Sequence, residues 1–354
     1  MISCQYGEGE NLPCIYEKII ETMKFEIKKF DDFSKSKVIE TITSLWNNEM
    51  GEIFPITKEL MKRSTYETKG FLSDVSSIAI VDGEIVGFII AKIWNHPIEV
   101  LAYKNVGWIS LIYVDPLYRE KGIGSALLNK VESDFTILGK KELNLGRDYQ
   151  NFFPGIPMDL KSSSTWFEHR GYELMNTTND LVKHIKPSNA LIPLKQFKDG
   201  KNYTIRISNE NDKEELKQFI TSNWPGRWAV EVSDYVDQGA NLYFICLDEN
   251  NRICGFCRFE NDETPTSIIG YGLTWRNRFE HLGSIGPLGV ESSHRHNNIA
   301  YNLLAAANNH LVQLNVTDIM IDWTNLMDLY RKFGFEVWKS YIYTKKEINY
   351  EKIC

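Results

Sequence analysis

The chain has 354 residues, of which 43% are hydrophobic and 25% are charged, and its formal net charge is −7. This length corresponds to roughly two domains, and the composition is typical of folded globular proteins rather than of disordered segments. Because the net charge is negative and no dense block of Lys or Arg occurs, a nucleic-acid partner is disfavoured.

The start of the chain and its cysteines bear on where the protein resides. Residues 1–20 contain no basic segment followed by an apolar one, so they do not resemble a secretory signal. No apolar run approaches the roughly 18 residues that span a bilayer, so no membrane partner is expected. The six cysteines are scattered rather than arranged as a compact disulfide framework. A cytoplasmic location is therefore expected.

Elements of the first half are predicted from apolar periodicity in the order β-α-α-β-β-β-α-β-α-β. The expected strands are Phe25–Phe30, Ser76–Val81, Ile85–Trp94, Val106–Val114 and Glu142–Leu145, with two short strands before Ile185. The tripeptide Asp82-Gly83-Glu84 is typical of a tight hairpin turn. Apolar residues from Ala126 to Val131 recur at helical spacing and predict an amphipathic helix.

The second half is predicted to repeat this order after a linker. Residues 186–202 contain two prolines and several lysines without periodicity, as is typical of an interdomain segment. The strands expected after it are Tyr203–Ile207, Leu242–Leu247, Ile253–Phe259, Ser284–Val290 and Ile319–Asp322, with a long helix from about Asn298. We therefore predict an internal duplication, with a 1–24 extension, domains at 25–185 and 203–354, and a linker at 186–202.

Position arithmetic supports the duplication. Arg119 and Arg295 follow equivalent strands and are 295 − 119 = 176 residues apart, whereas Gly171 and Gly334, each after a short aromatic helix, are 334 − 171 = 163 apart. The first copy therefore has 13 additional residues between these markers, and we place them in the loop from Asp148 to Ser162.

Two cysteines of the second half form a CxxC pair, Cys254 and Cys257. Neither a second CxxC nor a nearby His pair completes a four-ligand metal site. On an extended strand, residues three apart point to opposite faces, so the two sulfurs are expected to diverge. We predict ordinary buried strand residues and no metal site.

A short glycine loop joins the strand that ends at Val114 to the helix that follows it. Loops of this kind bring backbone amides together at a helix N-terminus, which favours a bound phosphate. Side chains at Gly122 or Gly124 would obstruct the approach of that phosphate. A plain strand-turn-helix joint also uses glycine, but neither a Walker Lys-Ser pair nor a complete GxGxxG is present, which disfavours ATP and dinucleotides.

The run V-D-P-L-Y-R-E-K-G-I-G-S-A-L-L at 114–128 resembles motif A of the GNAT family of acyl-CoA N-acetyltransferases, with its pattern Gln/Arg-x-x-Gly-x-Gly/Ala. The second copy is similar through Arg295-His296-Asn297-Asn298-Ile299-Ala300, with Asn298 in place of the first loop glycine. Asn tolerates a left-handed backbone better than most residues, so this change weakens the second loop without excluding it. The resemblance covers about Phe25 to Lys346 and implies a mixed α/β fold of two tandem GNAT domains, each a splayed mixed sheet flanked by helices.

The resemblance also implies that acetyl-CoA, the co-substrate, lies between the fourth and fifth strands of a copy, with its pyrophosphate on the loop. In the first copy the implied contacts are Ile112, Tyr113, Val114, Arg119, Glu120, Lys121, Gly122, Ile123, Gly124 and Ser125. In the second copy they are Leu288, Gly289, Val290, Arg295, Asn297, Asn298, Ile299, Ala300, Tyr301 and Asn325.

Catalysis by such a protein needs a proton donor for the departing thiolate. In the family this donor is often a Tyr four residues before the glycine that ends the fourth helix. The second copy has Tyr330 before Gly334, whereas the first has Phe167 before Gly171. Tyr330 is therefore the candidate catalytic residue, although an aromatic packing role is the alternative. The first copy has the better phosphate loop, and the second copy has the acid.

Residues on the acceptor side are less specific. The segments Trp224-Pro225-Gly226-Arg227-Trp228 and Phe152 to Pro157 are rich in aromatics that suit a sugar face, or that pack between domains instead. Substrate contacts are predicted at Trp224, Trp228, Glu231 and Asp322, with Asp234 as another carboxylate able to receive an ammonium. The stretch from Asp322 to Tyr330 is also similar to bacterial tandem GNAT proteins that acetylate glucosamine and glucosaminides.

We therefore expect acetyl-CoA-dependent N-acetylation of a small primary amine, with an amino sugar preferred over a polyamine, an aminoglycoside or a peptide N-terminus. Chemistry is expected in the second domain, and the first domain is expected to close the acceptor pocket. The alternative is an acyl-CoA sensor without activity. The sequence leaves the acceptor, the general base and the choice between monomer and homodimer open.

Overall fold

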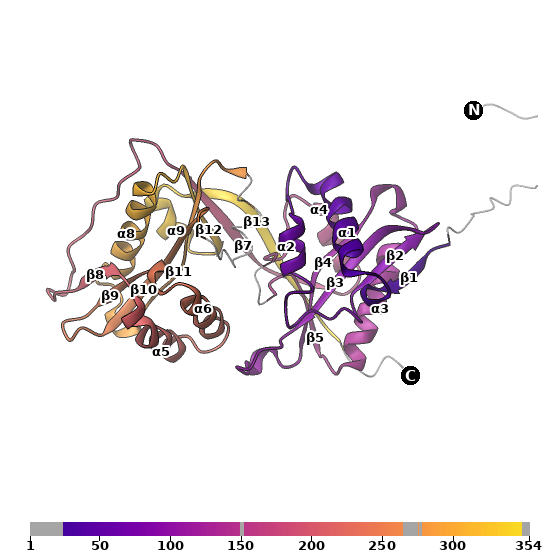
Figure 1. The fold of residues 1–354 in the computed structure, drawn as a ribbon, viewed down its shortest axis with the longest axis horizontal. Coiled ribbons are helices and arrows are strands. Elements are labelled where there is room, and N and C mark those ends of the chain that lie inside the picture. Colours follow the sequence, from indigo (N-terminus) through magenta and orange to yellow (C-terminus); the bar gives the residue numbers. More distant parts are fainter. Residues whose placement is uncertain (1–23, 149–151, 265–274, 276–277, 349–354) are drawn as a thin grey trace, which may run out of the picture.

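The computed structural model describes residues 24–148, 152–264, 275 and 278–348, which form two lobes (Figure 1). The first lobe begins with one strand and two helices, and most of its remaining elements are strands. Its strands are β1 (Glu26–Lys29), β2 (Ser77–Val81), β3 (Glu84–Ile93), β4 (Val106–Val114), β5 (Glu142–Leu145), β6 (Ile156–Pro157) and β7 (Glu173–His184). Its helices are α1 (Lys35–Met50), α2 (Lys58–Arg63), α3 (Ile123–Ile137) and α4 (Lys161–Glu168).

The second lobe repeats this order of elements. Its strands are β8 (Thr204–Ile207), β9 (Tyr243–Leu247), β10 (Ile253–Asn261), β11 (Leu282–Val290), β12 (Asp318–Thr324) and β13 (Glu336–Glu347). Its helices are α5 (Lys213–Asn223), α6 (Arg227–Gln238), α8 (Ile299–Gln313) and α9 (Met327–Tyr330). The predicted mixed α/β architecture with splayed sheets flanked by helices is confirmed.

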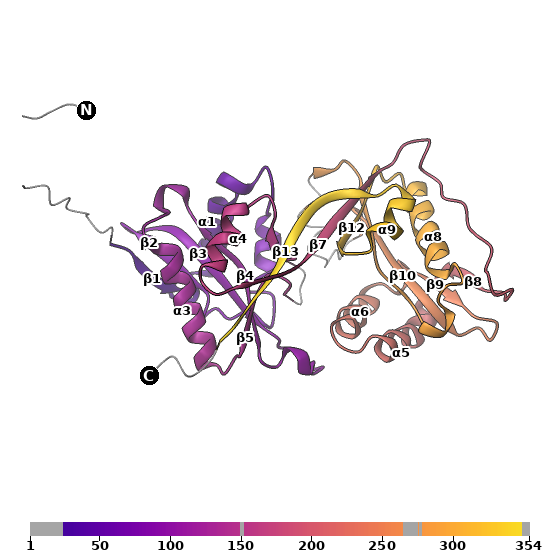
Figure 2. The ribbon, with the colours of Figure 1, turned by 180° about the vertical axis from the view of Figure 1, so that it is seen from behind.

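One continuous sheet of 13 strands runs through both lobes, because the last strand of each lobe crosses to the other. Its order is β1-β2-β3-β4-β5-β13-β7-β12-β11-β10-β9-β8, with β6 paired to β13. β13 of the second lobe pairs with β5 of the first, and β7 of the first lobe pairs with β12 of the second. Figure 2 shows these two long strands side by side where they join the lobes. The sequence patterns did not predict this exchange.

Residues with a left-handed backbone confirm the duplication. Positive φ occurs at Glu120 and His296, at Gly122 and Asn298, at Gly139 and Asn315, and at Arg147 and Trp323. The members of each pair are 176 residues apart (296 − 120, 298 − 122, 315 − 139 and 323 − 147). The next pair, Gly171 and Gly334, is 163 apart. The 13 additional residues of the first copy therefore lie after Arg147.

The parallel strands β4 and β5 diverge after one short stretch of pairing, and so do β11 and β12. β4 pairs with β5 from Val106 to Ile109, and β11 pairs with β12 from Leu282 to Ser284. Beyond these residues β4 no longer pairs with β5, and β11 no longer pairs with β12. Each lobe therefore has a V-shaped opening in its sheet.

The opening of the first lobe is filled by its own chain. Asp148 accepts hydrogen bonds from Ser110 Oγ at 2.6 Å and from Lys92 Nζ at 2.9 Å, and all three residues are buried. Phe152 and Phe153 follow in the additional segment and are 4% and 5% exposed. The prediction that the aromatic segment Phe152–Pro157 borders an acceptor is therefore wrong for these residues, because they pack into the core with Trp46 and Phe54.

The linker lies along α8. Lys195 exchanges backbone hydrogen bonds with the buried Asn302 side chain at 2.8 Å in each direction, and Asn298 Nδ2 donates to the Gln196 carbonyl at 2.8 Å. Asn297 Nδ2 donates to Asp199 Oδ2 at 2.9 Å. The predicted linker is thus held against the first turn of α8 and the loop before it.

Cys254 and Cys257 are both buried and free, in the apolar cluster that also contains α8 residues. A β-bulge between Ile253 and Gly255 interrupts the strand alternation, so the expectation that the two sulfurs face apart is wrong. Burial raises the pKa of the Cys257 thiol, which suits a packing role. Across the part of the chain that the structure describes, no helix has the length and apolar character needed to cross a membrane.

Candidate active site

A cavity of about 690 Å³ lies between the lobes, at the opening between β11 and β12. The second lobe supplies most of its walls, from α6, β11, β12 and α9, and the first lobe closes one side. The second lobe contributes Arg227, Trp228, Glu231, Tyr235, Ile285, Gly286, Pro287, Leu288, Ile321, Asp322, Trp323, Thr324, Asn325, Leu326 and Tyr330. The other side is formed by Tyr103, Trp108, Asn144, Arg147 and, from the exchanged strand β13, Tyr343.

Tyr330 ends α9 and faces this cavity with a side chain that is 7% exposed. Burial raises the pKa of its phenol, and the nearby Cys257 and Asp322 act in the same direction. A hydrogen bond with the Thr324 side chain opposes this shift, and the Thr324 hydroxyl also accepts from the Leu326 amide at 3.1 Å. Tyr330 therefore stays protonated over the whole neutral pH range and can serve as a proton donor.

Asp322 lies on the divergent half of β12 and lines the same cavity. Burial raises its pKa well above that of an ordinary Asp, and Asp180 and Glu231 raise it further, whereas Arg227 lowers it. Asp180 lies behind the cavity wall, where it accepts from Tyr341 Oη at 2.8 Å, and burial raises its pKa to about 6. A carboxyl group with a raised pKa is a good proton acceptor near neutral pH.

Two arginines bring positive charge into the cavity. Arg227 begins α6, forms an ion pair with Glu231 one turn further on, and stacks on the Trp323 ring at 4.5 Å. Arg147 comes from the first lobe and stacks on the Tyr343 ring at 4.5 Å. Tyr343 in turn donates to Asn144 Oδ1 at 3.1 Å.

The loop before α8 adopts the left-handed backbone that is expected at the position of Asn298. Asn298 is left-handed with φ 66° and ψ 10°, as Gly122 is in the first copy with φ 86° and ψ −9°. Arg295 Nε donates to the Val290 carbonyl at 3.1 Å, and Arg119 Nε donates to the Val114 carbonyl at 2.8 Å. The two loops therefore share one conformation despite their different sequences.

The predicted site residues fall into three groups. Six of them line the cavity: Leu288, Asn325, Tyr330, Trp228, Glu231 and Asp322. Trp224 does not, because it packs on Trp228 and Phe256 beneath Gly289. In the second lobe, Gly289 and Val290 end β11, and Arg295 to Tyr301 run from the following loop into the start of α8. In the first lobe, Ile112 to Ser125 run from the end of β4 through the matching loop into the start of α3.

The sequence predicted that the first domain closes the pocket, but not which of its residues do so. Arg147, Tyr103, Trp108 and Asn144 belong to elements whose place opposite the second lobe depends on the strand exchange. Tyr343 reaches the cavity for the same reason. The positive φ of Arg147 is a structural signal that a single sequence does not contain. Arg227, in contrast, lies in the aromatic segment Trp224–Trp228, which the sequence indicates as a candidate acceptor segment.

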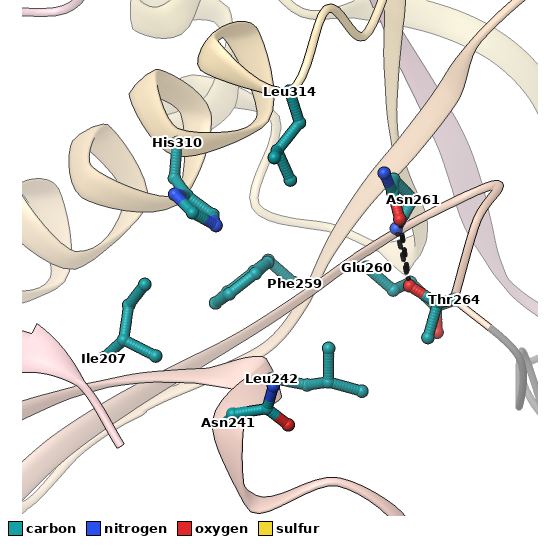
Figure 3. Close-up of a pocket in the computed structure, with 9 residues that line it drawn as sticks. All are labelled: Ile207, Asn241, Leu242, Phe259, Glu260, Asn261, Thr264, His310 and Leu314. Atoms are coloured by element: carbon teal, nitrogen blue, oxygen red, sulfur yellow. Dashed lines mark hydrogen bonds between the residues drawn. The ribbon is translucent and has the colours of Figure 1, made fainter. Parts of the chain in front are cut away.

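A second pocket of about 330 Å³ lies between β10 and the end of α8 (Figure 3). Its polar groups are engaged with the protein itself: Glu260 pairs with Arg258 at 2.8 Å, and Thr264 Oγ1 donates to Asn261 Oδ1 at 3.0 Å. His310 packs on the Phe259 ring, and burial lowers its pKa, so it is uncharged at neutral pH. The larger cavity is therefore the better candidate for an active site.

Comparison with known proteins identifies the family. The model of the acetyltransferase (GNAT) family matches residues 39–152 and again residues 213–335. The chain belongs to the GNAT family. It is an N-acetyltransferase with two GNAT domains in tandem, and this family uses acetyl-CoA. None of the curated proteins matches the chain in sequence.

Solved structures of GNAT proteins have the same fold over nearly the whole chain. A glucosamine N-acetyltransferase region of a fungal multidomain β-N-acetylglucosaminidase has a TM-score of 0.78 at 22% identity, covering 91% of this chain and 38% of that chain. A GNAT protein from Sphaerobacter thermophilus has a TM-score of 0.64 at 16% identity, covering 91% and 95% of the two chains. A tandem GNAT protein from the clavulanic acid pathway has a TM-score of 0.61 at 11% identity, covering 92% and 98%.

The order of elements at the opening of the second sheet suits acetyl-CoA. β11 diverges from β12 after Ser284, and the loop of α8 follows at the end of the same strand. This order of divergent strand, loop and helix N-terminus provides backbone groups for an extended arm and amides for a phosphate. Among the described residues, no group of three or more His, Cys, Asp or Glu side chains has a metal-binding arrangement.

Proposed function

We propose that the second domain transfers an acetyl group from acetyl-CoA to a small primary amine, and that the first domain serves mainly to close the cavity. The observation that carries this proposal is the shared cavity. Tyr330 and Asp322 line it at the opening of the second sheet, whereas the equivalent opening of the first lobe is filled by Asp148 and its partners.

The comparison of the two sheet openings also leads us to assign acetyl-CoA to the second lobe. Leu288 and Asn325 line the cavity on the two sides of the divergence, as the family resemblance implied. We assign the pyrophosphate to residues Arg295 to Tyr301, because the start of α8 offers backbone amides there. The Asn297 and Asn298 side chains are turned toward the linker, so backbone amides would make the phosphate contacts.

In the proposed reaction the amine nitrogen attacks the thioester carbonyl. A carbon–nitrogen bond forms, the carbon–sulfur bond breaks, one proton leaves the amine and one proton joins the thiolate. Asp322 is assigned the first proton, because its raised pKa makes it an effective base. Tyr330 is assigned the second proton, because its phenol stays protonated. Asp322 is regenerated when its proton passes to solvent, and Tyr330 is regenerated when it regains one.

An amino sugar is the preferred acceptor. The cavity combines aromatic rings of Trp228, Trp323 and Trp108 with the carboxylates of Glu231 and Asp322. Aromatic faces suit the apolar face of a sugar ring, and carboxylates suit its ammonium group. The fungal neighbour, a glucosamine N-acetyltransferase region, supports the same class of acceptor at the level of fold.

Thiol release from acetyl-CoA tests the proposal directly. The purified chain is mixed with glucosamine, a polyamine, an aminoglycoside or a peptide with a free N-terminus, and the products are identified by mass spectrometry. The expected result is thiol release with an amino sugar, with acetyl on nitrogen. Tight CoA binding without release by any amine would instead favour an acyl-CoA sensor.

A further inference from the structure

Arg147 is a positive charge that the proposed chemistry does not use. It follows β5 in the first lobe, its backbone is left-handed with φ 53°, and its side chain lines the cavity of the second lobe. Its guanidinium stacks on Tyr343, a ring delivered by the exchanged strand. The left-handed backbone of Arg147 and the exchange of strand β13 together hold this cation at the cavity wall.

Among the described residues, none of the groups that act on the Arg147 charge is an Asp or a Glu. Burial and Arg227 lower the pKa of Arg147, whereas Tyr343 and Tyr103 favour its charge. Arg227 differs, because Glu231 pairs with it. The internal segments outside the description, residues 149–151, 265–274 and 276–277, contain no Asp or Glu.

The two arginines of the cavity therefore differ in their pairing. Arg227 and Glu231 form an ion pair and neutralise each other. Arg147 is half-buried and has no carboxylate partner of this kind among the described residues. Desolvating an arginine without a carboxylate or phosphate is costly, and its planar fork matches the oxyanions of those groups.

We propose that Arg147 binds an oxyanion of the acceptor, so that the preferred acceptor is an amine that also carries a phosphate or carboxylate group. This inference rests on the proposed function, because it assigns the amine to the Asp322 and Tyr330 side of the cavity and the anion to the wall supplied by the first lobe. It also gives the first lobe a role in substrate specificity.

A purely structural role for Arg147 makes a different prediction. Stacking on Tyr343 would hold the wall in place, and the Arg147→Met variant would then affect all acceptors to the same extent. A contact with acetyl-CoA, which is also anionic, would instead raise the KM for acetyl-CoA. The proposal requires an effect that depends on the anionic group of the acceptor.

The experiment measures binding without turnover. Quenching of tryptophan fluorescence reports ligands in the cavity, because Trp108, Trp228 and Trp323 line it. Glucosamine, glucosamine 6-phosphate and 2-amino-2-deoxygluconic acid are titrated in the absence of acetyl-CoA. The expected result is that one or both anionic ligands bind roughly ten- to a hundredfold tighter than glucosamine, as a charge-assisted contact implies. Which of the two binds tighter distinguishes a phosphate from a carboxylate.

Variants assign this difference to Arg147. Arg147→Met is expected to abolish the preference for the anionic ligands, and Arg147→Lys is expected to keep part of it. Lys345→Ala is the control, since this lysine lies two residues from Tyr343 on β13, pairs with Glu142 and does not line the cavity. It is expected to leave the preference unchanged.

The outcomes separate the two proposals. Equal affinity for neutral and anionic amino sugars, or a preference that survives in Arg147→Met, overturns the role of Arg147. A raised KM for acetyl-CoA in that variant, with the acceptor preference unchanged, also overturns it. If the anion preference and its loss are seen but no amine is acetylated, the anion site stands and the proposed function fails.

Discussion

The two sheet openings of this chain have the same geometry but different contents. Ser110 and Asp148 of the first lobe correspond, 176 residues further on, to Gly286 and Thr324 of the second. In the first lobe, Lys92, Ser110 and Asp148 form a buried polar network, and the additional segment with Phe152 and Phe153 packs beside it. In the second lobe, the same place opens into the cavity of about 690 Å³.

This difference supports a division of tasks between the two copies. The better phosphate loop, with Gly122 and Gly124, stands in the lobe whose opening is filled. The lobe with Tyr330 keeps an open cavity, and its Asn298 reproduces the backbone of Gly122. A glycine loop therefore does not by itself indicate the active copy, and the space at the sheet opening supports our proposal that the second copy is active.

The largest effect is expected from Tyr330→Phe. Removal of the phenol proton leaves the thiolate without its donor, so kcat should fall about a thousandfold, within the usual range for a general acid. Initial rates of thiol release measure this, with acetyl-CoA and acceptor saturating. Tyr172→Phe, which removes a phenol bonded to Glu132 in the first lobe, is the matched control. An unchanged kcat in Tyr330→Phe would locate the chemistry elsewhere.

Asp322→Asn should produce the next largest effect and change the pH profile. A base must be deprotonated to accept the amine proton, so wild-type kcat/KM should fall as the pH drops through the raised pKa of Asp322. The variant should lose about a hundredfold in kcat at neutral pH, and the acidic limb that belongs to Asp322 should disappear. If the acidic limb persists with the same midpoint in the variant, another group is the base.

A pair of equivalent substitutions compares the two loops. Ala300 and Gly124 each occupy the second position of the helix that follows the loop. Ala300→Asp places a negative charge against the expected pyrophosphate and should raise the KM for acetyl-CoA about tenfold, whereas Gly124→Asp should leave it unchanged. Aspartate at a helix N-terminus stabilises the helix, so both variants should fold. The reverse pattern would move acetyl-CoA to the first lobe.

The smallest effect is expected from Asn298→Gly, which makes the second loop resemble the first. Asn298 already adopts the left-handed conformation, so glycine removes a small conformational cost together with the hydrogen bond from Asn298 Nδ2 to the Gln196 carbonyl of the linker. The KM for acetyl-CoA should change less than about threefold. A tenfold decrease would mean that the asparagine limits binding in the second lobe.

Much of the fold could be predicted from the sequence. The apolar runs predicted Val106–Val114 and Glu142–Leu145 with the bounds that β4 and β5 have, and the spacing of glycines and arginines predicted the duplication and its 13-residue excess. Motif A and Tyr330 could be predicted because the residues that identify each of them lie close together in the sequence. Pairing of β13 with β5 joins residues about 200 positions apart, such as Leu143 and Lys346, which are 346 − 143 = 203 apart, and no local pattern contains it.

The rest of the site depends on that pairing. Arg147 and Tyr343 meet across the exchanged strand, and Trp108 reaches the cavity from the first lobe. The filling of the first opening likewise depends on Asp148 meeting Lys92, which are 56 residues apart. Periodicity shows that such residues are buried or exposed, but not which distant partners they contact.

A crystal structure of the chain with a non-hydrolysable acetyl-CoA analogue tests most directly which lobe binds acetyl-CoA. We expect the analogue in the second lobe, with its pantetheine arm between β11 and β12, its pyrophosphate at residues 295–301 and its sulfur facing Tyr330. An analogue bound only on the Arg119 to Ser125 loop of the first lobe would show that the second lobe is not the acetyl-CoA site.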